Sequence, residues 1–96
     1  MTYKLVFETQ ALKEWQKLNH SIREQFKKKL AKVLENPEIP ANKLREIPNG
    51  YKIKLRSAGY RLIYQVQNQQ VTVVVVAIGK RERSEAYETA KHRLAH

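Results

Sequence analysis

Cysteine is absent from this 96-residue chain. Its absence excludes disulfide bonds and thiolate metal sites and fits a reducing compartment, so we expect a cytoplasmic protein. Long apolar runs are also absent: the longest, Val73 to Ile78, is far too short to span a bilayer. Lys4 and Glu8 interrupt the first apolar segment, so we expect neither a signal peptide nor a membrane partner.

Acidic residues are scarce. The chain has 9 Asp and Glu against 19 Lys and Arg, which gives a net charge of +10 and an isoelectric point near 10.0. This clustered excess predicts a partner of negative charge, nucleic acid above all. The alternative is a basic protein whose charges serve only solubility. The length predicts a single domain over residues 1–96, with no room for a separate cofactor-binding domain, and we expect no cofactor.

Histidine is scarce too, and it does not suggest a metal site. His92 and His96 have the i,i+4 spacing of two ligands on one helix, but no third ligand accompanies them. A solvated helix end is the better interpretation. Because no histidine lies near the basic strands described below, any acid–base chemistry there would need another group.

The hydrophobic periodicity predicts an α+β fold. We expect a twisted, mainly antiparallel four-stranded sheet with an N-terminal helix hairpin on one face and a short C-terminal helix. The continuously apolar strand should be central, with the first strand as its second neighbour. The strands are predicted over residues 3–7, 51–56, 60–67 and 71–78, and the helices over 9–18, 21–35 and from 84 onward.

Local signals refine the helices and the loop that follows them. Thr9 is expected to cap the first helix, and Ser21 with Glu24 matches a capping box for the second. Trp15 could stack on a nucleic-acid base, but its helical spacing favours the core. The expected core residues are Trp15, Phe26, Leu30, Ile53, Leu62 and Tyr64, with Leu12 on the same stripe and Leu44 and Ile47 pinning the proline-containing loop.

Basic residues occupy one face of the strand over residues 51–56. Lys52, Lys54 and Arg56 alternate with apolar residues, so they point to the side opposite the core. A hairpin loop of two or four residues would place Arg61 on this face, with Arg56 opposite it. Like charges packed in this way repel each other, and the repulsion is relieved when a polyanion binds.

Such a face could hold phosphates or cleave RNA. RNA supplies its own nucleophile, the 2′-OH, so cleavage needs a base, cations around the phosphorus and an acid for the leaving oxygen. Neighbouring cations lower the pKa of a lysine, which makes Lys54 the candidate base. Tyr87 could stack on a base or bond a phosphate, or merely anchor the last helix. Composition and spacing alone favour binding over catalysis.

Four segments together resemble the RelE family of bacterial toxins. They are ALKEW at 11–15, REQFKKKL at 23–30, GYKIKLRSAGYRLIYQV at 50–66 and VVAIGKRERSEAY at 75–87. The resemblance covers essentially the whole chain in order and spacing. It implies a RelE/ParE-like and microbial-RNase-like fold and a cytosolic, metal-independent endoribonuclease of a type II toxin–antitoxin pair. Such a toxin cuts mRNA in the ribosomal A site and is held inactive by a RelB-like antitoxin, with DNA a partner only through the antitoxin.

The resemblance also implies roles for five residues of this chain. Lys54 would be the general base, Arg81 the general acid or leaving-group stabiliser, and Lys52 and Arg61 charge stabilisers, while Tyr87 would stack on and orient a base. Further RNA contacts are expected from Arg45, Arg56, Lys80, Arg83, Lys27 and Lys28.

Two other classes of function remain open. ParE-like toxins resemble this fold but inhibit DNA gyrase and lack the full cationic set. A non-catalytic RNA-binding module would need the basic face but not Arg81 or Tyr87.

Overall fold

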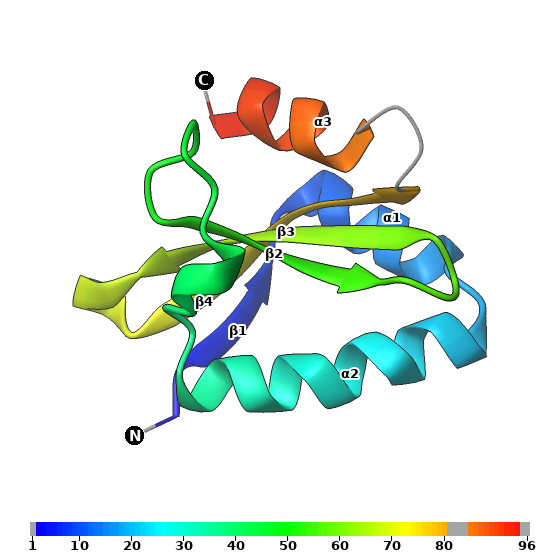
Figure 1. Cartoon of the computed structure of the whole chain (residues 1–96), viewed down its shortest axis with the longest axis horizontal. Helices are drawn as coiled ribbons and strands as arrows, with labels where there is room; N and C mark the ends of the chain where they lie inside the picture. Colours follow the sequence, from blue (N-terminus) through cyan, green and yellow to red (C-terminus); the bar gives the residue numbers. More distant parts are fainter. Residues whose placement is uncertain (1, 81–84, 95–96) are drawn as a thin grey trace.

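A four-stranded sheet separates two N-terminal helices from one C-terminal helix (Figure 1). The structure, a computed structural model, describes residues 2–80 and 85–94. The element order is β1 (Lys4–Phe7), α1 (Thr9–Lys17), α2 (His20–Glu35), η1 (Pro40–Asn42), β2 (Gly50–Leu55), β3 (Tyr60–Gln67), η2 (Asn68–Gln70), β4 (Thr72–Lys80) and α3 (Glu85–Leu94). The predicted α+β class and its elements are confirmed.

The strand order is β1-β4-β3-β2, so β4 lies between two neighbours as predicted. β1 runs parallel to β4, whereas the β2–β3 and β3–β4 pairs are antiparallel. The sheet is therefore mainly antiparallel. β4 can take this position because its residues are apolar toward both faces, which only a doubly covered strand can bury.

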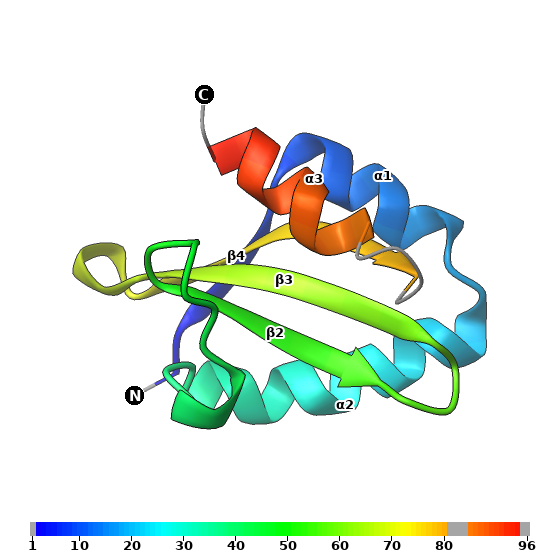
Figure 2. The ribbon, with the colours of Figure 1, turned by 45° about the horizontal axis from the view of Figure 1, so that its top comes forward.

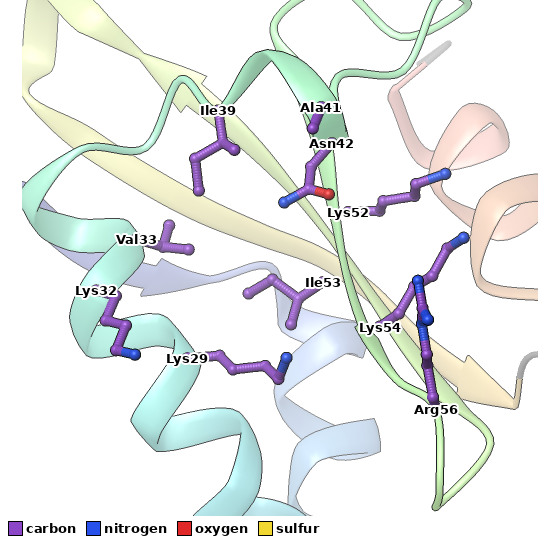
Figure 3. Close-up of a pocket in the computed structure, with 10 residues that line it drawn as sticks. All are labelled: Lys29, Lys32, Val33, Ile39, Ala41, Asn42, Lys52, Ile53, Lys54 and Arg56. Carbon is purple, nitrogen blue, oxygen red and sulfur yellow. The ribbon is translucent and has the colours of Figure 1, made fainter.

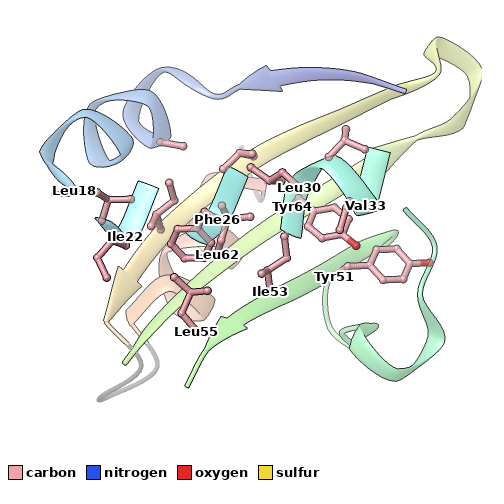
Figure 4. Close-up of a cluster of buried hydrophobic side chains, with 14 of the residues drawn as sticks. Leu18, Ile22, Phe26, Leu30, Val33, Tyr51, Ile53, Leu55, Leu62 and Tyr64 are labelled. Atoms are coloured by element: carbon pink, nitrogen blue, oxygen red, sulfur yellow. The ribbon is translucent and has the colours of Figure 1, made fainter. Parts of the chain in front are cut away.

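The helices α1 and α2 cover one face through a cluster that we call the hairpin core (Figure 4). Of the expected core residues, Phe26, Leu30, Ile53, Leu62 and Tyr64 are buried. The buried hydroxyl of Tyr64 donates a hydrogen bond of 2.8 Å to the carbonyl of Pro37, which ties the loop after α2 to the sheet. The hairpin core consists of Ala11, Leu18, Ile22, Phe26, Leu30, Val33, Tyr51, Ile53, Leu55, Leu62, Tyr64, Val66, Val73, Val75 and Ile78.

Two residues of α1 differ in how well they match the expectation. Trp15 packs against the hairpin core, with its ring centroid 5.2 Å from that of Phe7 and 6.3 Å from that of Phe26. The prediction that Leu12 shares the buried stripe is wrong, because its side chain is 41% exposed. Ala11 and Leu18, which were predicted on the same stripe, are buried, so the helix brings a small side chain close to the sheet and leaves Leu12 at the border of the stripe.

The second face is covered by α3 through a smaller cluster, the α3 core. Leu44 and Ile47 are buried there, which confirms that they pin the loop before β2. A β-bulge in β4 pairs Ile63 with Ala77 and Tyr64 with Val75, so Val76 is the extra residue. The α3 core consists of Leu44, Ile47, Ile63, Val76, Ala77, Ala86 and Ala90.

Both helix caps differ from the prediction. The Glu8 carboxylate, not Thr9, accepts a hydrogen bond of 2.9 Å from the Ala11 amide at the start of α1. The Asn19 side chain accepts one of 2.9 Å from the Ile22 amide, so α2 begins before Ser21 and no capping box forms. Asn caps a helix as well as Ser does, and the earlier cap lengthens the helix. Among the described residues, no helix has the length and apolar character needed to cross a membrane.

Candidate functional site

The predicted basic face lies on β2, an edge strand of the sheet. Tyr51, Ile53 and Leu55 are buried toward the hairpin core, whereas Lys52 and Lys54 are partly exposed and point to the opposite side. This is the side covered by α3, and both amino groups extend toward that helix (Figure 3). The alternation of β2 therefore places two cations beside the helix that carries Tyr87.

The β2–β3 hairpin brings Arg61 to the same face. Its four-residue connection, residues 56–59, pairs Lys54 directly with Arg61 and Lys52 with Ile63. Gly59 adopts a positive φ of 72° in this turn, a conformation that residues with a Cβ rarely adopt. The prediction that Arg56 stands opposite Arg61 is wrong: Arg56 lies in the turn beyond the last pair and is exposed. The last pair of the ladder is Leu55 with Tyr60, so Arg56 is the first residue of the four-residue loop and has no partner in the ladder.

The crowding of cations changes the chemistry of Lys54. The charge of Lys52 is the largest cause that lowers the pKa of Lys54, followed by a hydrogen bond with Lys52, desolvation, and the charges of Arg61 and Arg56. A lysine with a lowered pKa is neutral at a lower pH than an isolated lysine. At a given pH a larger fraction of Lys54 than of an ordinary surface lysine is therefore neutral and free to accept a proton.

Arg61 has an unused donor. Its Nε atom is buried and has no hydrogen-bond partner among the described residues. Buried donors in folded proteins are nearly always paired, so an unpaired guanidinium nitrogen is a charged donor that an anion could satisfy once the Arg61 side chain moves to expose it. Together with Lys54 opposite it, Arg61 can bind an anion such as a phosphate.

Tyr87 lies on α3 and contacts two charged neighbours. The Glu46 carboxylate lies close enough to its hydroxyl to affect its ionisation, and the Lys91 amine lies 5.4 Å from its ring centroid. Lys91 also forms an ion pair of 2.7 Å with Glu46. Desolvation and then the Glu46 contact raise the pKa of the Tyr87 hydroxyl, while the hydrogen bond from Lys91 is the main cause that lowers the pKa of Glu46. The Tyr87 hydroxyl therefore loses its proton at a higher pH than a free tyrosine does.

The other predicted site residues are spread around this face. Arg45 and Lys80 are exposed on the segments that flank it, and Lys27 and Lys28 are exposed on α2. Arg81 and Arg83 lie outside the described residues. Within the described ranges, no group of three or more metal-ligating side chains could hold an ion.

A groove between α2 and the edge of β2 contains two more lysines of α2, a helix whose lysines were expected to contact ribosomal RNA. It has a volume of about 510 Å³, and Lys29 and Lys32 of α2 line it (Figure 3). No acidic side chain contributes to the lining. The sequence shows that the α2 lysines point in different directions around the helix. Which of them face β2 can be told only when the position of α2 beside β2 is known. The full lining is Lys29, Lys32, Val33, Ile39, Ala41, Asn42, Lys52, Ile53, Lys54 and Arg56.

Known proteins share both the sequence and this architecture. A family profile described as "ParE toxin of type II toxin-antitoxin system, parDE" matches residues 5–85. The mRNA interferase toxin RelE of Escherichia coli K12 is 60% identical over 98% of this chain and 99% of its own. The free structure of the E. coli RelE R81A/R83A mutant superposes with a TM-score of 0.90 at 57% identity, over 98% and 99% of the two chains. RelE in the intact E. coli RelBE toxin–antitoxin complex superposes with a TM-score of 0.81 at 60% identity, over 84% of this chain and 99% of that one.

Proposed function

This chain belongs to the RelE family of type II toxins, and from that membership we propose that it is an endoribonuclease that cleaves mRNA in the ribosomal A site. It would act in the cytoplasm and inhibit translation, as one domain over residues 1–96. The observation that carries the proposal is the convergence of Lys52, Lys54 and Arg61 on one face, where the Lys54 pKa is lowered and the Arg61 Nε has no hydrogen-bond partner among the described residues.

The proposed reaction uses the RNA's own 2′-OH as nucleophile. The neutral amine of Lys54 takes the 2′-OH proton while that oxygen attacks the adjacent phosphorus. The bond from phosphorus to the 5′-oxygen breaks, which leaves a 2′,3′-cyclic phosphate and a 5′-hydroxyl. Arg81 protonates or stabilises the leaving oxygen, and Lys52 and Arg61 stabilise the negative charge on the phosphoryl oxygens.

Tyr87 and the groove would position the RNA. A neutral phenol ring offers a face on which a base can stack, so Tyr87 would orient the nucleotide beside the cleaved bond. The groove shares Lys52 and Lys54 with the basic face and adds Lys29 and Lys32, which suits the backbone of an adjoining strand. Exposed cations at Arg45, Arg56, Lys80, Arg83, Lys27 and Lys28 would add ribosomal contacts.

Single-turnover cleavage on programmed ribosomes tests this function. We expect Lys54→Ala and Arg81→Ala each to slow cleavage by about 10²-fold or more, because each removes a group that acts on a moving proton or charge. Ribosome affinity should change little, since many other cations share the binding. Lys13→Ala, an exposed lysine on α1, is the matched control. If Lys54→Ala and Arg81→Ala both cut at the wild-type rate, the proposed roles are wrong.

The ribosome would be required for the cleavage reaction as well as being the place where it occurs. With no histidine at the site, the chain depends on an external surface to align the 2′-OH, phosphorus and leaving oxygen. We therefore expect salt-sensitive ribosome binding and little specific cutting of free RNA. Equally fast, codon-phased cleavage of free mRNA would contradict this requirement.

We further propose that a RelB-like antitoxin inhibits this toxin by covering the basic face or displacing α3. The structures of RelE with RelB support this partner class. The α3 core receives mainly alanines from α3, so a segment with larger side chains could compete for that face. Faster amide exchange in residues 85–94 on antitoxin binding would support displacement. A bound antitoxin that neither moves α3 nor protects the basic face would contradict both versions.

The match to the ParE profile supports gyrase inhibition as a second candidate. A DNA supercoiling assay with purified gyrase separates the two candidates. Inhibition of supercoiling without mRNA cleavage would favour the ParE-like function.

A further inference from the structure

Strand β4 continues past the end of its neighbour β1. The parallel pairing stops at Phe7 opposite Val75, while β4 runs on to Lys80. Backbone groups on that side of β4 beyond Val75 therefore lack a strand partner among the described residues. Unpaired backbone groups at a partly buried edge are unfavourable unless side chains satisfy them.

Two charged side chains from distant parts of the sequence satisfy this edge. Glu14 of α1 accepts a hydrogen bond of 3.0 Å from the Ile78 amide. Arg93 of α3 donates one of 2.6 Å from Nη1 to the carbonyl of Val76, the bulge residue. The two side chains also join each other, with Arg93 Nη1 and Nη2 at 3.1 Å and 3.0 Å from the two Glu14 oxygens. We call this arrangement the edge clasp.

The edge clasp is unlike the other described ion pairs. The Arg93 side chain is only 17% exposed, whereas both side chains of each pair outside the clasp are at least 38% exposed. Glu8 lies 3.6 Å from Arg93 and adds a second carboxylate. A two-pronged Arg–carboxylate pair that also bonds backbone groups fixes geometry more firmly than a solvated pair does. The clasp therefore ties α3, α1 and β4 together at one point.

The apolar attachment of α3 rests on small side chains. Among its described residues the buried ones are Ala86 and Ala90, which contribute little apolar area, and Tyr87 and Leu94 are partly buried beside them. α3 and α1, which cover opposite faces of the sheet, meet across the free edge of β4 through Arg93 and Glu14 (Figure 2). Tyr87 precedes Arg93 on the same rigid helix by about 9 Å along its axis. A shift at Arg93 is therefore transmitted to the Tyr87 ring.

We propose that Glu14 and Arg93 are positioning residues of the cleavage site, which hold α3, and Tyr87 with it, on the side of the sheet to which Lys52 and Lys54 point. The same clasp immobilises Val76 and Ile78, just before the segment that leads to Arg81. Neither residue contacts the RNA in this role. The inference rests on the proposed nuclease function, because Tyr87 must orient a nucleotide for its position to matter.

Single-turnover kinetics on programmed ribosomes tests the clasp. Arg93→Ala and Glu14→Ala should each lower the maximal cleavage rate by about tenfold while ribosome affinity stays within about twofold, since misplacing a group slows the reaction without weakening binding. Arg93→Lys keeps the charge but lacks the two-pronged geometry, so it should restore only part of the rate. Lys13→Ala and Glu88→Ala, exposed positions on α1 and α3, are the matched controls.

A double-mutant cycle of Arg93 and Tyr87 distinguishes a positioning role from a simple loss of stability. In a Tyr87→Ala background, Arg93→Ala should lower the rate by less than about twofold, because the group it positions is already absent. If Arg93→Ala keeps its full tenfold effect in that background, the clasp does not act through Tyr87 and the proposal is overturned. Circular dichroism confirms that each variant is folded at the assay temperature.

Amide hydrogen exchange of the free protein tests whether the clasp holds α3, and it does not depend on cleavage activity. Amides 86–94 and the Ile78 amide should exchange faster in Arg93→Ala, while those of α2 should not change. Unchanged exchange would overturn the tethering role. If the wild-type chain cuts no mRNA, the proposed function and the catalytic role of the clasp both fail, whereas an active wild type with fully active clasp variants refutes the clasp alone.

Discussion

The two faces of the sheet are held by different forces. The hairpin core buries large side chains such as Phe26, Leu62 and Tyr64 under two helices. The α3 core receives mainly Ala86 and Ala90 from its helix, which is fastened at its borders by charged contacts through Arg93 and Lys91. Burial is non-directional and insensitive to salt, whereas ion pairs have defined geometry and are screened.

The difference suggests a division of labour. The face held by apolar burial carries stability, and the face held by charges carries the site. Packing cations beside Lys54 is unfavourable for the isolated fold, so a basic site needs a stable foundation elsewhere. A helix attached mainly by charged contacts can also be released by a partner without unfolding the rest of the molecule.

The largest expected effect is on the hairpin core. Phe26→Ala should lower the free energy of unfolding by about 3–5 kcal/mol, because it removes a fully buried ring and leaves a cavity. Ala90→Gly on α3 should lower it by only about 1 kcal/mol, the usual helix-propensity difference. Urea unfolding followed by circular dichroism measures both. Equal losses would show that the two faces contribute alike to the free energy of unfolding.

The second effect concerns the charged face and pH. If Lys54 is the base, cleavage should rise with pH until Lys54 is mostly neutral and then level off. Lys52→Met removes the largest cause that lowers the Lys54 pKa, so that pKa should rise and the ascending limb should move to higher pH. The rate at neutral pH should then fall. Single-turnover rates across the pH range measure the limb, with Lys13→Met as the control. A limb that stays in place would argue against Lys54 as the base.

A smaller effect is expected from salt. Raising the ionic strength should speed amide exchange in α3 by less than about fivefold, because exposed pairs such as Lys91–Glu46 are weak and screened. Amides around Phe26 and Leu30 should show no comparable change. Hydrogen exchange by mass spectrometry at low and high salt gives both numbers. A uniform response along the chain would mean that α3 is not held differently.

The smallest effect is local to Tyr87. Glu46→Gln should lower the pKa of the Tyr87 hydroxyl toward its ordinary value, because the carboxylate contributes to raising it. The pKa of Lys91 should fall as well, since the hydrogen bond from Lys91 to Glu46 is the largest cause that raises it. Carbon-detected NMR titration of labelled tyrosine measures the shift, with Tyr87→Phe to assign the signal. Glu38→Gln, an exposed glutamate in the same connecting segment, should leave Tyr87 unchanged.

Local patterns predicted the elements well and their ends less well. The alternation in β2 placed Lys52 and Lys54 on the correct side, and the apolar β4 was correctly made central. The caps were misplaced because Glu8 and Asn19 can bond the first free amides as well as Thr9 and Ser21 can. The roles assigned to the site residues stay predictions. Arg81 and Arg83 themselves lie outside the described residues.

The net charge of +10, the alternation of β2 and the apolar character of β4 can all be read from the residue types alone. These follow from residue types and short periods, which need no knowledge of distant contacts. The folded chain was needed to establish that Lys54 pairs with Arg61, that Lys29 and Lys32 line the groove at the edge of β2, and that Glu14 meets Arg93. The physical reason is that hairpin register, helix placement and the length of β1 relative to β4 are set by packing the whole chain, and side chains 79 positions apart meet only as its result.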